Sequence, residues 1–93
     1  MNFTEDKKNE YWNYFLTQKD FWGHGVTMNR LKKVKLILWN DDNFWSDILF
    51  RHNGGMETPE QMKMRDKFAY NHCIGNMASM INQTIHTHKI IKQ

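Results

Sequence analysis

The side chains best suited to bind a metal or to act in catalysis lie in the C-terminal third of the chain: His72, Cys73, His86 and His88. His86 and His88 lie two residues apart, about 200° around a helix, so they cannot bind one ion without unwinding it. His72 and Cys73 are neighbours, and adjacent helical side chains point apart, so they form no nucleophile–base pair. No CxxC or HExxH motif occurs. We therefore predict no metal, no cofactor, no catalytic residues and a protein that is not an enzyme.

A basic cluster lies earlier in the chain, at Arg30, Lys32, Lys33 and Lys35. On a helix these side chains project in several directions and form no single stripe that would follow a phosphate backbone. The net charge of +3 and the sequence pI near 9.1 permit nucleic-acid binding without arguing for it. Nucleic-acid binding through this cluster stays open as an alternative function.

Aromatic residues are frequent for so short a chain, with 4 Trp, 3 Tyr and 6 Phe among 93 residues. Each large aromatic side chain buries roughly 150–250 Å², and a domain of this size has difficulty hiding them all. Aromatic side chains also concentrate binding energy at interfaces. We expect a protein partner to contact the tryptophans, of which at least two belong to the core: Trp12, Trp22, Trp39 and Trp45.

The segment from Phe68 to His88 has no Asp, Glu, Lys or Arg. An ordinary surface helix carries charge on its wet face, so we expect this helix to be largely enclosed by its own domain, by copies of itself or by a partner. Its apolar arc predicts a homo-oligomer, with a dimer favoured, through Tyr70, Ile74, Met77, Ile81 and Ile85. The opposite arc is either a solvated face or a polar surface for a partner or small ligand; it holds Asn71, His72, Asn76, Ser79, Asn82, Gln83 and His86.

Capping residues mark the elements that must position these side chains. Thr4 and Thr27 can each cap a helix, and Thr58-Pro59-Glu60-Gln61 has the pattern of a capping box with proline at the first helical position. Glycines predict where helices end, at Gly23-His24-Gly25 and at Asn53-Gly54-Gly55. Residues 33–39 also alternate like a strand, but helix is favoured because no second strand is present to pair with them.

These signals predict an all-α fold, a small helical bundle with three short helices and one long C-terminal helix from about Pro59. The chain is one domain, 1–93, with aromatic-rich short helices in 1–57 and a long uncharged helix in 58–93. A helix of about 33 residues would be some 50 Å long, more than the width of such a domain. It must therefore kink, near Gly75, or project and pack against another subunit.

The cysteine count, the length of the apolar runs and the composition predict where in the cell the protein acts. The single cysteine, Cys73, allows no intramolecular disulfide and is typical of a small buried hydrophobe in a reducing compartment. No apolar run reaches the ~20 residues of a membrane span, and the N-terminus lacks the pattern of a signal peptide. We expect a cytoplasmic protein without membrane contact. The abundance of Asn, Lys and Met suggests an AT-rich genome and a phage- or mobile-element-borne gene.

The C-terminal half, around Lys67-Phe68 and Gly75-Asn76, is similar to small helical phage proteins that sequester cyclic nucleotides. This resemblance implies an oligomeric binder of a small nucleotide as one alternative, and no site residue is transferred from it. The preferred hypothesis is a non-enzymatic binding protein, an accessory or inhibitory factor that docks on another macromolecule.

Overall fold

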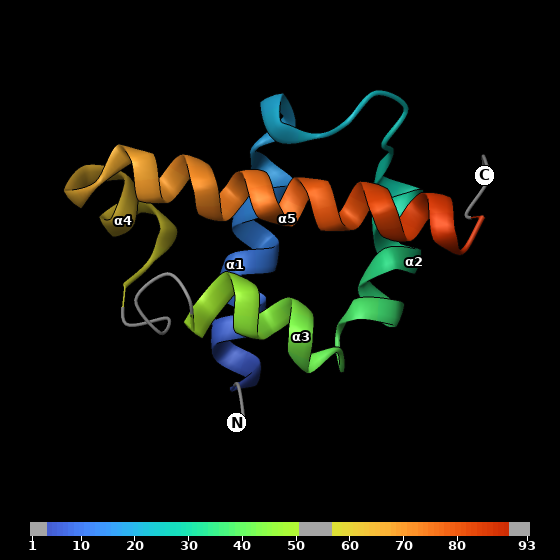
Figure 1. Ribbon diagram of the computed structural model, residues 1–93, viewed down its shortest axis with the longest axis horizontal. Helices are drawn as coiled ribbons and strands as arrows, with labels where there is room; N and C mark the ends of the chain where they lie inside the picture. Colours follow the sequence, from blue (N-terminus) through green and yellow to red (C-terminus); the bar gives the residue numbers. More distant parts are fainter. Residues whose placement is uncertain (1–3, 51–56, 90–93) are drawn as a thin grey trace.

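The longest helix, α5 (Lys67–Thr87), crosses the whole molecule, and the other helices pack around one side of it (Figure 1). α1 (Glu5–Thr17) passes behind α5 at a steep angle, with α2 (Met28–Leu38), α3 (Asp42–Trp45) and α4 (Pro59–Arg65) placed around the pair. This computed structural model describes residues 4–50 and 57–89, which contain no strand. The prediction of an all-α fold is confirmed.

Side-chain caps start the helices where the sequence predicts. The Thr4 hydroxyl accepts the backbone N–H of Lys7 at 3.2 Å, and the Thr27 hydroxyl accepts that of Arg30 at the same distance. The Asp41 carboxylate accepts the N–H of Asn43 at 3.0 Å and begins α3. Each bond satisfies a donor that the first helical turn leaves without an intrahelical partner.

The predicted capping box is present at the start of α4. The Thr58 hydroxyl accepts the Gln61 N–H at 3.0 Å, while the Gln61 side chain accepts the Thr58 N–H at 2.9 Å. We expect Thr58→Ala to lower the free energy of unfolding by about 1 kcal/mol, because it removes an N-cap acceptor. Urea denaturation would measure the loss. Thr87→Ala, at an exposed helix C-terminus, is the control, and an equal effect in both variants would contradict the capping account.

The predicted 33-residue helix is in fact two helices, broken at Asp66. The Asp66 backbone is extended, with φ −153° and ψ 98°, and its carboxylate accepts the Ala69 N–H at 3.1 Å. Asp66 therefore ends α4 and caps α5, whereas α5 runs through Gly75 without interruption. The break lets the chain fit within a longest dimension of 37 Å, so no helix projects from the domain.

α1 ends at Thr17, earlier than the predicted stop at Gly23. The Phe15 carbonyl accepts both the Gln18 N–H at 3.0 Å and the Trp22 indole N–H at 3.1 Å. This carbonyl is thus unavailable for the next bond of the α-helical series, and the chain turns through the 3₁₀ segment η1 (Lys19–Phe21). Gly25 has a positive φ of 81°, which glycine adopts without strain.

The ambiguous segment 33–39 is helical through Leu38 and then turns. α3 continues directly into the π-helical segment η2 (Ser46–Phe50). The predicted stop at Asn53-Gly54-Gly55 lies outside the described residues. No described helix is long and apolar enough to cross a membrane.

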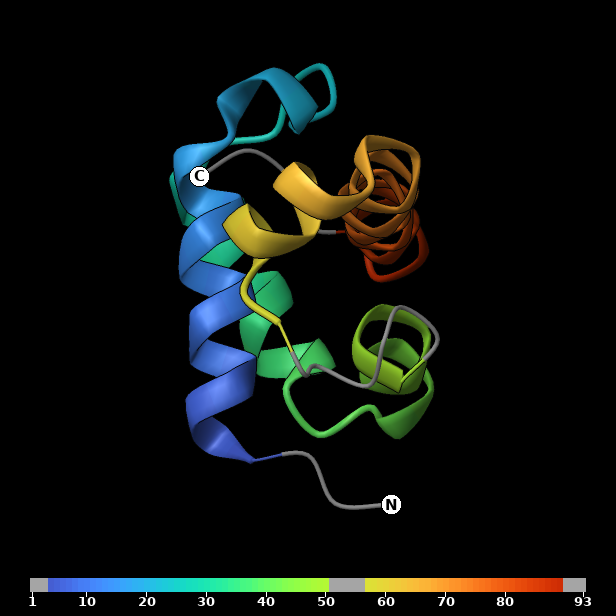
Figure 2. The same ribbon diagram turned by 90° about the vertical axis from the view of Figure 1, so that its left-hand side faces the viewer.

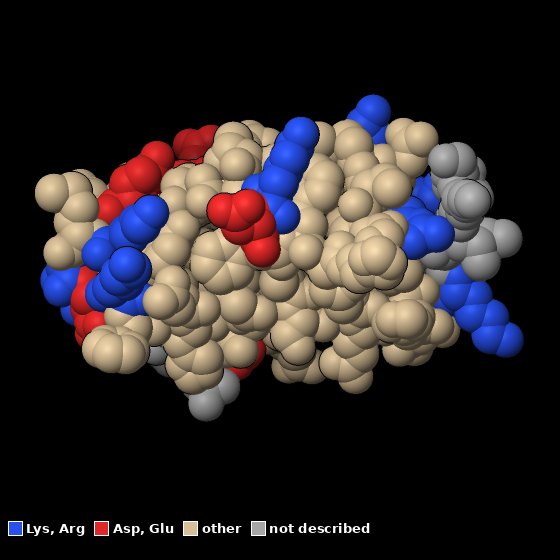
Figure 3. Space-filling model, turned by 90° about the horizontal axis from the view of Figure 1, so that it is seen from above, with Lys and Arg blue, Asp and Glu red and all other residues tan. Residues whose placement is uncertain are grey.

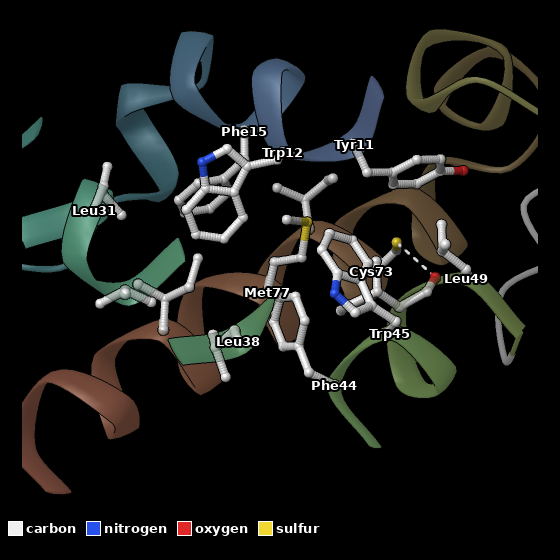
Figure 4. Close-up of a cluster of buried hydrophobic side chains, with 14 of the residues drawn as sticks. Tyr11, Trp12, Phe15, Leu31, Leu38, Phe44, Trp45, Leu49, Cys73 and Met77 are labelled. Atoms are coloured by element: carbon white, nitrogen blue, oxygen red, sulfur yellow. Dashed lines mark hydrogen bonds between the residues drawn. The ribbon is translucent and has the colours of Figure 1, made fainter. Parts of the chain in front are cut away.

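The core lies between α5 on one side and α1 with α3 on the other (Figures 1 and 2). Met77 of α5 is fully buried and lies among the aromatic side chains of α1 and α3 (Figure 4). Six aromatic side chains are buried: Tyr11, Trp12, Phe15, Phe44, Trp45 and Tyr70. The one large aromatic that the described chain leaves exposed is Phe68.

Candidate functional site

The four tryptophans proposed as partner contacts divide into two pairs. Trp12 and Trp45 are at most 1% exposed, so their rings are occupied by the packing of the chain itself. Trp22 and Trp39 are partly buried at the edge of the core. The Trp22 indole N–H donates to the Phe15 carbonyl at the end of α1. Trp39, in contrast, lines an open groove, which makes it the tryptophan best placed for an external contact.

The apolar arc proposed as the oligomer interface is turned inward. All five side chains are between 0% and 9% exposed in the single chain: Tyr70, Ile74, Met77, Ile81 and Ile85. The Tyr70 hydroxyl also forms a 2.6 Å hydrogen bond with that of Tyr14. These residues hold the domain together and are not available to a second copy while the domain is folded.

The basic cluster is dispersed. The Arg30 guanidinium donates to the Gly25 carbonyl at 2.6 Å and holds the loop before α2. The Lys35 ammonium lies 4.8 Å from the centre of the Trp39 ring. Lys32 and Lys33 are exposed. The cluster therefore presents two exposed cations beside an aromatic groove rather than a row of four that would follow a phosphate backbone.

The groove around Trp39 is an open hollow of about 420 Å³ between the first turn of α1 and the last turn of α2. It combines an indole, an aliphatic side chain, one charge of each sign and two amides: Glu5, Asn9, Lys35, Leu36, Trp39 and Asn40. A mixed apolar and polar lining of this kind suits a side chain and the polar backbone around it.

Several contacts position Trp39 in this groove. Its indole N–H donates to both carboxylate oxygens of Glu5, at 2.9 and 3.2 Å, and its ring packs edge-on against Trp45 with centroids 5.5 Å apart. Its backbone carbonyl accepts the Trp45 indole N–H at 3.1 Å. An aromatic side chain fixed in advance loses little conformational entropy when a partner contacts it.

Lys8 supports Trp39 from within the fold. Its side chain is 8% exposed, and its ammonium donates to the Trp39 carbonyl at 2.9 Å. The same ammonium lies 5.7 Å from the Trp39 ring centre and 5.9 Å from that of Trp45. Buried charge is costly unless it is paired or hydrogen-bonded, and here the Trp39 carbonyl, two aromatic rings and the Glu5 carboxylate at 3.9 Å compensate it.

The sequence analysis named Lys35 and Trp39 but missed the other groove residues, of which Leu36 is the apolar one. It is 81% exposed, although α2 buries Leu31, Val34 and Leu38. The signal was present in the spacing, because Leu36 lies about 200° around the helix from both Val34 and Leu38, which are buried. An exposed leucine beside a fixed tryptophan enlarges the apolar part of the groove.

Cys73 has no exposed thiol for covalent chemistry. Its side chain is fully buried and donates to the Ile48 carbonyl at 3.5 Å (Figure 4). Burial, with a smaller contribution from Asp47, raises the pKa of the thiol to about 12, so the nucleophilic thiolate is scarce at neutral pH. The described residues also contain no group of three or more His, Cys, Asp or Glu side chains able to hold a metal ion.

No protein-family model matches this chain, and no curated protein or solved structure is significantly similar to it.

Proposed function

We propose that this chain is a non-enzymatic binding protein, an accessory or inhibitory factor that docks on a protein partner through the groove around Trp39. The observation that carries the proposal is the combination of a tryptophan fixed by Glu5 with the adjacent Leu36, 81% exposed. Tryptophan is enriched at the energetic centres of protein interfaces, and an apolar neighbour adds contact area around it.

The charge around the groove defines the chemistry of the partner. Lys32, Lys33 and Lys35 lie on α2 near Leu36, and the carboxylate of Glu5 is engaged by the Trp39 indole. A complementary partner has a bulky apolar side chain that packs on Leu36 and Trp39, with carboxylates facing the lysines. An acidic amphipathic segment has both features.

Leu36→Glu should weaken docking at least about tenfold, because it removes an apolar contact and places a carboxylate against an acidic partner. The fold should be unaffected, since the side chain is exposed. The measurement is capture of partners from a host lysate by tagged protein, at low and high salt and with nuclease. Met64→Glu, which introduces the same charge at an 89% exposed residue of α4, is the matched control.

A protein captured by wild type and by Met64→Glu, resistant to nuclease and lost with Leu36→Glu, would support docking at this groove. Loss of every partner on nuclease treatment would favour the nucleic-acid alternative through the basic cluster. Retention of the same protein by Leu36→Glu would place the contact elsewhere and contradict the proposal.

A further inference from the structure

The outer face of α5 has no partner among the described helices. Met77 is fully buried on the inner side, and at 100° per residue the opposite line of the helix passes within about 20° of Phe68, Gly75, Ser79 and His86. Figure 2 shows α5 nearly end on, with the other described helices to its left and below. Phe68, Ser79 and His86 on this line are exposed in the single chain.

Phe68 is a large apolar side chain on the outer face of α5. It is 89% exposed, and a phenylalanine side chain gains free energy by leaving water. Seven residues further along the same line is Gly75, where an added Cβ would meet nothing within 4 Å. An exposed ring followed by open space at a glycine is a shape that another helix can approach closely.

The absence of charge identifies what kind of helix fits. No Asp, Glu, Lys or Arg occurs from Phe68 to His88. In Figure 3 charged side chains lie at the two ends and near the centre of the view, whereas the lower edge, on the side of α5, is mostly uncharged between its ends. In a symmetric contact each patch meets a copy of itself, so a charged patch would meet like charge. An uncharged patch avoids that repulsion and offers a charged partner nothing complementary.

The residues of this face are also complementary about its midpoint. Two antiparallel copies of α5, related by a two-fold axis at Met77, place Phe68 beside the partner's His86 and Gly75 beside the partner's Ser79. These pairs bring ring to ring and small residue to small residue. The antiparallel arrangement also opposes the two helix dipoles, which a parallel one would align.

We propose that the outer face of α5 is a dimer interface that takes a second copy of this chain in antiparallel orientation. The expected homodimer then uses the face opposite Tyr70, Ile74 and Met77, which belong to the core. None of the residues that line the Trp39 groove belongs to α5, so the groove is not part of this interface.

The proposed contact between the two α5 helices is small. Phe68 and His86 are 18 residues apart, so the paired segment is about 27 Å long. A single helix from each copy buries an area at the low end for stable interfaces, and we expect a dissociation constant in the micromolar range.

Sedimentation equilibrium of the full chain tests the interface. Wild type should be a dimer at about 100 µM, and Phe68→Glu and Gly75→Glu should each raise the dissociation constant at least about tenfold. Gly75→Glu should keep the fold because an added Cβ meets nothing within 4 Å, and circular dichroism should show an unchanged helix content. Leu36→Glu carries the same charge on another face and should dimerise like wild type.

Spin labels test the orientation. Labels on Ser79→Cys should lie about 6 Å apart along the helix axis and broaden each other's spectra, whereas labels on His86→Cys should lie about 27 Å apart. Cys73 is buried, so wild type should take up no label. Broadening at both positions would show parallel helices and overturn the proposal. A monomeric wild type, or a dimer that persists in both Phe68→Glu and Gly75→Glu, would overturn it equally.

Discussion

At about pH 8, the native protein is expected to react with iodoacetamide at Cys73 at least about a thousandfold more slowly than the unfolded chain does. Burial, with a smaller contribution from Asp47, raises the pKa of the thiol from 9.0 to about 12, and each pKa unit lowers the thiolate fraction about tenfold. The fully buried sulfur is also inaccessible to the reagent. Mass spectrometry of timed samples, in buffer and in urea, measures both rates.

Ser46→Cys provides the control within the same folded domain, because its new thiol is exposed, lies outside α5 and should react rapidly. A native rate for Cys73 within about tenfold of the unfolded rate would contradict the buried placement.

The raised pKa of the Cys73 thiol also predicts how stability depends on pH. Because the folded protein holds the thiol proton more tightly than the unfolded chain does, the thiol contributes to stability fully at pH values below its unfolded pKa. This contribution should be lost as pH rises from about 9 toward 12. Urea denaturation across that range measures the loss.

Trp45→Ala is expected to lower the free energy of unfolding by about 3–5 kcal/mol. Trp45 is fully buried, packs against Phe44 with ring centroids 4.8 Å apart, and donates its indole N–H to the Trp39 carbonyl. Its removal leaves a cavity beside Trp39. It also removes one of the two aromatic rings that lie near the Lys8 ammonium. A loss of this size approaches the whole stability of many small domains.

Thermal and urea denaturation followed by circular dichroism would measure this loss. Trp45→Phe keeps most of the buried volume and should retain a cooperative transition. Leu36→Glu should denature like wild type because its side chain is exposed. A cost below about 1 kcal/mol for Trp45→Ala would show that the side chain is not part of the core.

Local chemistry made the helix starts predictable from sequence. Thr4, Thr27 and Thr58 are capping residues whose partners lie three positions along the chain, so the bond depends on near neighbours only. The break at Asp66 was also locally encoded, as a capping carboxylate, but the uninterrupted helical pattern on both sides concealed it. The end of α1 could not be predicted this way, because it depends on the Trp22 indole reaching back to Phe15.

The site was harder to predict than the fold, because exposure is a tertiary property. Trp39 and Trp45 are the same type of residue, yet Trp39 lines a groove and Trp45 is buried in the core. Which tryptophan lies where depends on Lys8 and Glu5, more than thirty residues earlier in the chain. Leu36 and Phe68 were detectable as apolar residues opposite the buried stripes of their helices, and that signal was available in the spacing.

The central claim is docking of an acidic amphipathic segment at the Trp39 groove, and an NMR titration tests it most directly. The probe is a synthetic helical peptide with leucine on one face and glutamate elsewhere, and the same peptide with lysine in place of glutamate is the control. We expect the acidic peptide to shift the Trp39 indole N–H signal and the backbone amides of residues 32–40, while the basic peptide leaves them unchanged. Shifts confined to the outer face of α5, equal shifts with both peptides, or no shift at Trp39 would contradict the claim.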